Sequence, residues 1–271
     1  MKRIIWIIVI VCMAGVLRFW RLTDVPPALN SDEIAIGYNA YSVLTTGRDE
    51  YNTPYPFTFR SFDDYKMPVY VYVVAGSMRI LGYNDFAVRF PSALFGTITV
   101  LFTYLLVREL FKRRDIAVVS SLLLAISPWS IHFSRSGYEA NAAVFFVVAA
   151  AYVFLKKSYI LSSVLFSLSI WTYLTPRIFV PLLVLGLALI YRREIWSKKF
   201  EALIALLIAV ALLLPIVKMS LSPEGQMRAA GVSAFGNPDD LKKSALRTLR
   251  DQEKGLKVFT IFDNRRMTYA R

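Results

Sequence analysis

An acidic pair, Asp32-Glu33, stands in a polar stretch after the first apolar segment, within Asn30-Ser31-Asp32-Glu33-Ile34. A carboxylate can remove the proton from an attacking hydroxyl. Cationic side chains can bind a phosphate and stabilise the charge that it gains on leaving. Such a combination would suit group transfer from a lipid-linked phosphate to a hydroxyl. A structural alternative is that the pair only caps a helix, with Ser31 or Asp32 at its N-terminus.

This chemistry needs further charged groups, and the chain supplies them at separate positions. The candidates are Lys66 and Arg89 in the same long polar region, Arg135 and Glu139 between two later apolar runs, and Arg177 between two more. Each has a simpler interpretation, because a lysine near a membrane can extend its ammonium to water and Glu139 can pair with Arg135 at a surface. Topology decides whether they share one side with Asp32.

The composition indicates an integral membrane protein. The 271 residues are 56% hydrophobic, and the mean hydropathy of +0.48 is too high for an ordinary soluble domain. The net charge of +13 gathers in clusters at the ends of apolar runs, as the positive-inside rule expects. A nucleic-acid-binding protein would instead carry this charge on one face of a soluble domain, so no nucleic-acid partner is expected. The clusters are Lys112–Arg114, Lys156-Lys157, Arg192-Arg193 and Lys198-Lys199.

The chain has one cysteine, Cys12, and one histidine. An internal disulfide framework is therefore impossible, and a zinc site is not expected. No other ligand set demands a metal, so the sequence predicts no cofactor and leaves a divalent cation open.

The predicted topology follows from charge parity, by which we mean the count of spans that places the later basic clusters on the same side of the membrane. The apolar run from Ile4 to about Trp20 lacks a small-residue cleavage site, which favours an uncleaved span with a cytoplasmic N-terminus. Residues 21–90 then form a long first outer loop. Met67–Leu81 is shorter than the roughly 20 residues of a span. If Met67–Leu81 does not cross the membrane, every later basic cluster faces the cytoplasm. We therefore predict that this stretch is a helix lying along the membrane surface.

The predicted fold is all-α and integral to the membrane, with seven spans and juxtamembrane helices in the first outer loop. A transmembrane domain at 1–219 precedes an extracytoplasmic loop at 220–271, which we expect to be truncated before further spans. After the first span, the predicted spans are Ser92–Phe111, Ile116–Phe133, Asn141–Leu155, Tyr159–Thr175, Ile178–Tyr191 and Phe200–Met219. This topology places Asp32, Glu139 and Arg177 on the outer side, at the level of the lipid headgroups.

Several of these stretches resemble the start of the GT-C glycosyltransferases. They are the Asn30–Tyr41 stretch with its Asp-Glu pair, Thr46–Tyr51, Lys66-Met67-Pro68-Val69-Tyr70, and the stretch that begins at Arg89-Phe90-Pro91. The similarity is to the bacterial branch of dolichyl-phosphate-mannose–protein mannosyltransferases and lipid A aminoarabinose transferases. A methionine stands at Met67 where that family has a second proline. The family's longer chains carry more spans.

The resemblance implies an inverting hexosyl- or pentosyltransferase that uses a polyprenyl-phosphate sugar donor. Its acceptor would be a hydroxyl on a protein, lipid or glycan, on the outer face of a prokaryotic plasma membrane. Asp32 would be the catalytic base, and Glu33 would orient or bind the acceptor. Lys66, Arg89 and Arg177 would bind the donor phosphate, and Glu139, Arg135 and Tyr65 would contact substrate. The rival hypotheses are a flippase or transporter for a lipid-linked sugar, and an inactive fragment.

Overall fold

The computed structural model describes residues 2–61 and 64–221. The first compact unit of the chain ends at Leu214, and the description below concerns that unit. The predicted truncated loop at 220–271 lies almost wholly outside the described residues, so that prediction stays open.

Most of the described chain is helical. The elements are α1 (Lys2–Phe19), α2 (Ser31–Thr46), β1 (Phe59–Ser61), β2 (Asp64–Lys66), α3 (Pro68–Leu81), α4 (Asp85–Phe111), α5 (Arg114–Ile126), α6 (Pro128–Arg135), α7 (Glu139–Leu155), α8 (Tyr159–Thr172), α9 (Pro176–Ile190), α10 (Arg192–Ser197) and α11 (Lys199–Ser220). The prediction of an all-α fold needs one correction, because β1 and β2 form a small antiparallel hairpin with Phe59 opposite Lys66. The hairpin leads directly into α3 and so positions Lys66.

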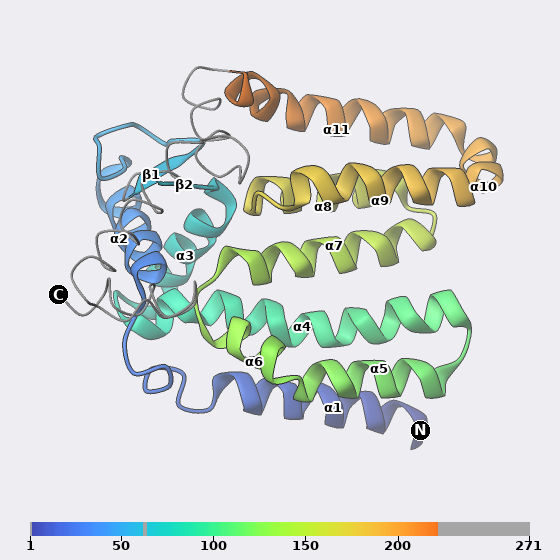
Figure 1. Ribbon diagram of the computed structural model, residues 1–271, viewed down its shortest axis with the longest axis horizontal. Coiled ribbons are helices and arrows are strands. Elements are labelled where there is room, and N and C mark those ends of the chain that lie inside the picture. Colours follow the sequence, from blue (N-terminus) through green and yellow to red (C-terminus); the bar gives the residue numbers. More distant parts are fainter. Residues whose placement is uncertain (1, 62–63, 222–271) are drawn as a thin grey trace, which may run out of the picture. The chain divides into compact units, whose positions relative to one another are not determined.

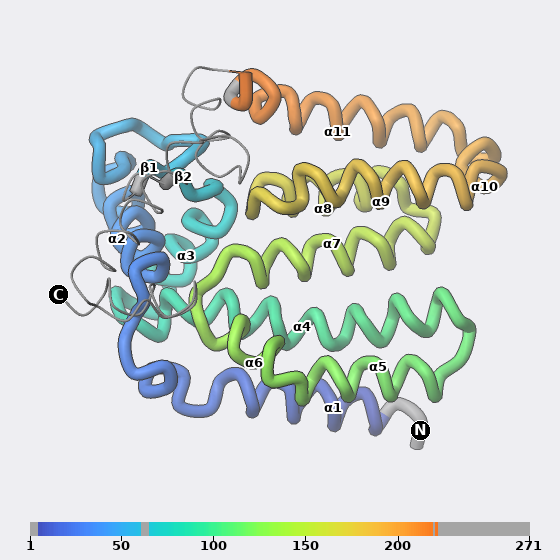
Figure 2. Tube along the Cα trace, viewed as in Figure 1, coloured from blue at the N-terminus to red at the C-terminus, as the bar shows by residue number. Residues whose placement is uncertain are grey.

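The long helices α1, α4, α5 and α7 run side by side, and α8 packs against α7 (Figures 1 and 2). The two short helices α2 and α3 and the hairpin gather at the end where α1 stops and α4 starts (Figure 1). There α2, α3 and α4 share an apolar core, which includes Ile36, Tyr70, Val74 and Ala87. This core fixes the polar N-terminal turn of α2 against the bundle.

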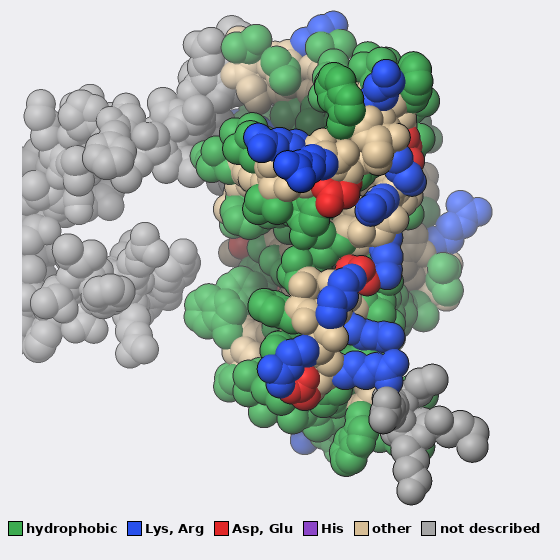
Figure 3. Space-filling view, turned by 90° about the vertical axis from the view of Figure 1, so that its right-hand side faces the viewer, with side chains coloured by type: hydrophobic (Ala, Val, Ile, Leu, Met, Phe, Trp, Pro, Cys, Tyr) green, Lys and Arg blue, Asp and Glu red, His purple; other side chains and the backbone are tan. Residues whose placement is uncertain are grey.

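The opposite end of the helices carries the turns α4–α5, α7–α8 and α9–α10. Lys and Arg side chains gather across that end (Figure 3). The basic clusters that charge parity assigned to one side of the membrane therefore share one end of the helices. Which side of the membrane this end faces stays a prediction.

Two described helices are long and apolar enough to cross a membrane, Asp85–Phe111 and Lys199–Lys218. The pair α5 and α6 passes the same test together, although it is bent by 55°. The shorter apolar helices are Ile5–Phe19, Pro68–Leu81, Glu139–Leu155, Tyr159–Thr172 and Pro176–Ile190. Length and composition thus support two or three spans, and the count of seven stays a prediction. The predicted helix at Met67–Leu81 is confirmed as a helix, α3.

The helix around Pro91 begins earlier than the predicted start at Ser92. Proline has no N–H to donate to the carbonyl four residues back, here that of Ala87, so a helix usually stops or bends at such a position. The hydroxyl of Ser77 in α3 donates to the Ala87 carbonyl at 2.7 Å instead. Helix α4 can therefore include Pro91 and reach back to Asp85, and this places Arg89 inside the helix rather than in a loop.

The predicted third span is broken at Ser127-Pro128. Pro128 cannot donate to the carbonyl of Leu124, and the bend leaves the carbonyl of Ala125 without a helical partner as well. The buried Arg18 of α1 fills both places, with donor–acceptor distances of 3.3 Å to Leu124 and 3.1 Å to Ala125. Its remaining donors reach Ala14, Ser130 and Ser134. Arg18 therefore holds the bend between α5 and α6.

Gly96 lies at a close approach of α4 to α6 and to Arg18. A Cβ atom at position 96 would lie 2.7 Å from the Cβ of Ser134 and 3.2 Å from the Nε of Arg18. We predict that Gly96→Ala lowers the free energy of unfolding by about 1–3 kcal/mol, the usual cost of overpacking. Thermal unfolding in detergent measures this effect.

Gly186→Ala is the matched control, because no atom lies within 4 Å of a Cβ at position 186 in α9. We expect this variant to be at least as stable as the wild type, since alanine favours the helix. Equal melting temperatures for the two variants would contradict the close packing at Gly96.

Candidate active site at one end of the helices

The Asp32-Glu33 pair lies in the first turn of α2. Its N-cap is Asn30, rather than Ser31 or Asp32, and the side chain of Asn30 accepts a hydrogen bond from the N–H of Glu33 at 2.9 Å. The Glu33 carboxylate in turn accepts from the N–H of Asn30 at 2.9 Å. This reciprocal capping box fixes the start of the helix. The capping alternative is therefore correct for Glu33, with the cap one residue earlier than expected.

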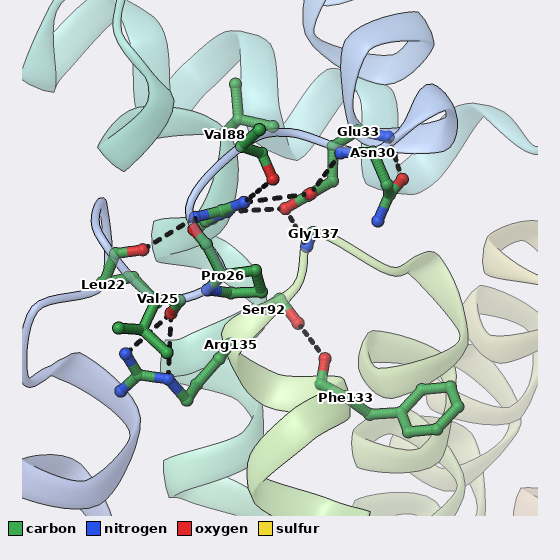
Figure 4. Close-up of polar contacts among 12 residues, drawn as sticks. Leu22, Val25, Pro26, Asn30, Glu33, Val88, Ser92, Phe133, Arg135 and Gly137 are labelled. Carbon is green, nitrogen blue, oxygen red and sulfur yellow. Dashed lines mark hydrogen bonds and ion pairs between the residues drawn. The ribbon is translucent and has the colours of Figure 1, made fainter. Parts of the chain in front are cut away.

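Glu33 is fully buried and lies at the meeting point of three segments. Its Oε1 accepts hydrogen bonds from the Nε of Arg89 and from the N–H of Gly137, both at 2.8 Å. Its Oε2 accepts from the N–H of Asn30 and, at 3.2 Å, from the Nη2 of Arg89. Figure 4 shows Glu33 between Asn30 and Gly137. A carboxylate with both oxygens occupied in this way has little capacity left for an acceptor substrate.

Arg89 is also fully buried, and its planar guanidinium uses every donor within the chain. Besides Glu33, it donates to the carbonyls of Leu22 at 3.0 Å, Pro26 at 2.7 Å and Ala28 at 2.7 Å. These carbonyls belong to the segment between α1 and α2. Arg89 thus attaches that segment and the start of α2 to α4, and the geometry favours this positioning role over donor phosphate binding.

Asp32 is placed differently from its neighbour. Its side chain is 47% exposed, and its Oδ1 lies 2.6 Å from the Nζ of Lys66, whose side chain is only 10% exposed. Lys66 comes from β2, directly before α3, so the hairpin brings this ammonium to the start of α2. The pair therefore joins an accessible carboxylate to a largely buried cation, as a base beside a phosphate-binding group would be.

Two further predicted residues lie beside this ion pair. The Oε1 of Glu139, at the start of α7, is 3.9 Å from the Nζ of Lys66. The Nη2 of Arg177, at the start of α9, is 2.9 Å from the Sδ of Met67, the residue that follows Lys66. Lys66 therefore has a carboxylate on each of two elements and a guanidinium beside its own segment.

Tyr138 stands next to the same charges, as the N-cap of α7. Burial raises the pKa of its phenol, and the negative charges of Asp32, Glu33 and Glu139 raise it further. The phenol is therefore protonated at neutral pH and can act as a hydrogen-bond donor. The sequence interpretation did not single out this residue.

Arg135 binds the backbone of another segment, and Tyr65 lies in the hairpin. Arg135 donates to backbone carbonyls at the end of α1 and in the segment after it, including that of Val25 at 2.7 Å (Figure 4). The others are those of Leu17, Arg18 and Arg21. Tyr65 lies in β2 opposite Arg60, and is half-buried. Arg135 thus positions the segment before Asp32, and a substrate contact for Tyr65 stays a prediction.

Gly137 is a site residue that the sequence did not reveal. A Cβ at this position would lie 3.3 Å from the Cγ of Glu33 and 3.3 Å from the carbonyl oxygen of Val88. Such distances are tight, so glycine allows the backbone N–H to reach the Glu33 carboxylate. A glycine between two apolar runs is common in turns, and nothing in the sequence near it points to Glu33.

Within the described residues no group of three His, Cys, Asp or Glu side chains could hold a metal ion. The prediction of no cofactor, with a divalent cation left open, stays a prediction.

The helices and this site define a helix-bundle protein of the membrane with paired acidic and basic groups at one end. The family model of the dolichyl-phosphate-mannose-protein mannosyltransferases matches residues 65–218, more than half of the chain. The chain therefore belongs to this family, and the resemblance to GT-C enzymes is confirmed. Lys66, Arg89, Glu139 and Arg177 lie within the matched residues, whereas Asp32 precedes them.

An uncharacterized protein of Aquifex aeolicus (strain VF5) is 31% identical to the chain over 88 residues. The match covers 32% of this chain and 18% of the Aquifex protein, so the chain spans less than a fifth of that relative. No solved structure matches the chain.

We predict that Arg89→Gln lowers the free energy of unfolding by about 3–5 kcal/mol, because it leaves the buried Glu33 carboxylate without its cation. Thermal unfolding in detergent measures the loss. Asp32→Asn is the control, because its carboxylate is half-exposed and Lys66 keeps Glu139 at 3.9 Å as a second carboxylate, so we expect a smaller loss than for Arg89→Gln. An Arg89→Gln protein as stable as Asp32→Asn would contradict the structural role of Arg89.

Proposed function

We propose that the protein is a glycosyltransferase that moves a sugar from a polyprenyl-phosphate donor to a hydroxyl of a protein, lipid or glycan. One observation carries the proposal. An accessible carboxylate, Asp32, contacts the buried ammonium of Lys66 at 2.6 Å. Family membership supports the glycosyl-transfer chemistry, while the donor, the acceptor and the stereochemistry belong to the proposal.

In the proposed reaction, Asp32 accepts the proton of the acceptor hydroxyl as its oxygen attacks the anomeric carbon. A new carbon–oxygen bond forms on the face opposite the phosphate, and the bond from the anomeric carbon to the phosphate oxygen breaks. The electron pair of that bond leaves with the polyprenyl phosphate, and the configuration of the anomeric carbon is inverted. The chain's own contribution is a base at a fixed position and cations beside the leaving group.

Lys66 is the first choice for the cation that binds the phosphate. It is largely buried, so its charge acts in a medium of lower dielectric constant than water. Arg177 lies within reach of the same segment and offers a planar guanidinium, which binds phosphate well. A donor phosphate between these groups would compete with Asp32 for the ammonium of Lys66 and would leave the carboxylate available to the acceptor.

Glu33 and Arg89 have a positioning role in this proposal. Both side chains are used up by contacts inside the protein, and both fix the turn that carries Asp32. Catalysis therefore depends on them through Asp32, rather than through direct contact with substrate.

We place the site on the extracytoplasmic side of a prokaryotic plasma membrane, in a seven-span topology with a cytoplasmic N-terminus. This orientation rests on the positive-inside rule, because the basic clusters lie at the other end of the helices (Figure 3). The site groups also lie at helix ends. A flippase or transporter would instead be expected to hold its charges midway across the membrane.

The first test is sugar transfer in membranes that contain the full chain, with a panel of radiolabelled polyprenyl-phosphate sugars. We predict that Asp32→Asn reduces turnover by at least about 100-fold, because loss of a general base typically costs 100- to 10,000-fold. The control is Asp24→Asn, which changes an exposed aspartate paired with Arg21 in the segment before α2. Wild-type turnover with Asp32→Asn would rule out Asp32 as the base.

Lys66→Gln tests phosphate binding separately from the role of Asp32 as the base. We predict a KM for the donor that rises about tenfold or more, because a charge-assisted hydrogen bond contributes roughly 1.5–3 kcal/mol. Arg79→Gln is the control, an exposed cation on the neighbouring helix α3. An unchanged donor KM in Lys66→Gln would remove this residue from the phosphate site.

A further inference from the structure

A polar cavity lies at the other end of the helices from Asp32. It has a volume of about 330 Å³ and lies between the C-terminal turns of α4 and α7 and the start of α5. Its lining consists of Leu105, Arg108, Glu109, Lys112, Arg114, Tyr152 and Lys156. None of these residues takes part in the proposed transfer reaction.

The cavity carries more positive charge than its surroundings neutralise. Four cations line it against a single carboxylate, Glu109. The C-termini of α4 and α7 add about half a negative charge each, and the N-terminus of α5 adds about half a positive charge. Roughly two and a half positive charges remain unbalanced, which is enough to neutralise the single negative charge of a phosphodiester.

The ion pairs show which cations are already used. Glu109 pairs with Lys112 and, at 2.5 Å, with Lys156, and so joins α4 to α7 at one wall of the cavity. Arg108 and Arg114 are exposed and have no carboxylate partner among the described residues. Two arginines with free donors at one cavity form a suitable site for a phosphate, because a guanidinium binds its oxygens in pairs.

The surroundings indicate that the phosphate belongs to a lipid. Leu105 and Tyr152 form the apolar side of the cavity, toward the middle of the helices. Leu110 and Phe111 are 47% and 59% exposed on the last turn of α4, where they can contact acyl chains. Trp196 in α10, at the same end of the helices (Figure 1), is 77% exposed, as is usual for an aromatic residue at the membrane boundary.

We propose that this cavity binds the phosphate headgroup of an anionic glycerophospholipid, with Arg108 and Arg114 as its main contacts. Basic pockets between membrane helices are a known means of binding such headgroups. The bound lipid would join α4, α5 and α7 at the end of the bundle away from Asp32. This inference does not depend on the proposed transfer reaction.

The positive-inside rule offers a simpler explanation, in which the basic residues only set the orientation of the helices. The two explanations differ in where they require the positive charges to lie. Orientation needs charge anywhere near this end, whereas a lipid site needs charge at the cavity. Variants with equal charge loss inside and outside the cavity therefore distinguish them.

The experiment uses native mass spectrometry of the full purified chain in detergent, titrated with phosphatidylglycerol or phosphatidylcholine. We expect preferential binding of phosphatidylglycerol, and a loss of affinity of about fivefold for each arginine removed in Arg108→Gln/Arg114→Gln. The matched control is Arg192→Gln/Arg193→Gln, which removes two charges from α10 outside the cavity. We expect this control to bind the lipid as the wild type does.

Equal loss in both double variants, or equal binding of the two lipids by the wild type, would overturn the proposal. Glycerol phosphate and inorganic phosphate are titrated in parallel, and binding of either as tightly as phosphatidylglycerol would show a site for a soluble anion instead. Arg114→Gln alone is measured as well, so that a double variant that fails to fold does not end the test.

Discussion

The buried pair of Arg89 and Glu33 is the constraint on which the site depends. A buried ion pair is stable only when the remaining donors and acceptors of both groups are satisfied. Arg89 meets this condition with carbonyls of the segment before α2, and Glu33 meets it with the N–H groups of Asn30 and Gly137. Segments far apart in the sequence are therefore joined at one point. The end of the bundle that holds the site has little freedom to rearrange without losing these bonds.

This constraint explains why two adjacent acidic residues can have different roles. Consecutive residues in an α-helix point about 100° apart around its axis. When Glu33 points into the interface with α4, Asp32 must point elsewhere, and it reaches the accessible side beside Lys66. The capping box fixes the rotation of this turn further. The position of Asp32 thus follows from the contacts of its neighbour.

The sequence predicted the helical membrane class, the helix at Met67–Leu81 and the sharing of one helix end by the basic clusters. It also identified Asp32, Lys66, Glu139 and Arg177, which the structure brings near one another. It could not predict the roles of Arg89 and Arg135, because an arginine that binds backbone carbonyls has no local sequence pattern.

The predicted helix boundaries were wrong for a related reason. Pro91 and Pro128 both suggest a helix boundary. Helix α4 nevertheless runs through Pro91, because Ser77 donates to the carbonyl of Ala87. The predicted third span does break at Pro128, where Arg18 donates to the carbonyl of Leu124. These compensating groups lie far from the prolines in the sequence and meet them only through tertiary packing. Arg18 did carry one signal, because a charged residue at the end of an apolar run needs a partner. The sequence alone does not identify that partner.

The most direct measurement is an experimental structure of the full chain with a polyprenyl phosphate bound. We predict that the phosphate lies within hydrogen-bond distance of Lys66 and near Arg177. Asp32 should face an open acceptor position, and Arg89 should still be bound to Glu33. A phosphate held by Arg89, with Glu33 released toward the acceptor, would contradict the division between positioning and catalytic residues.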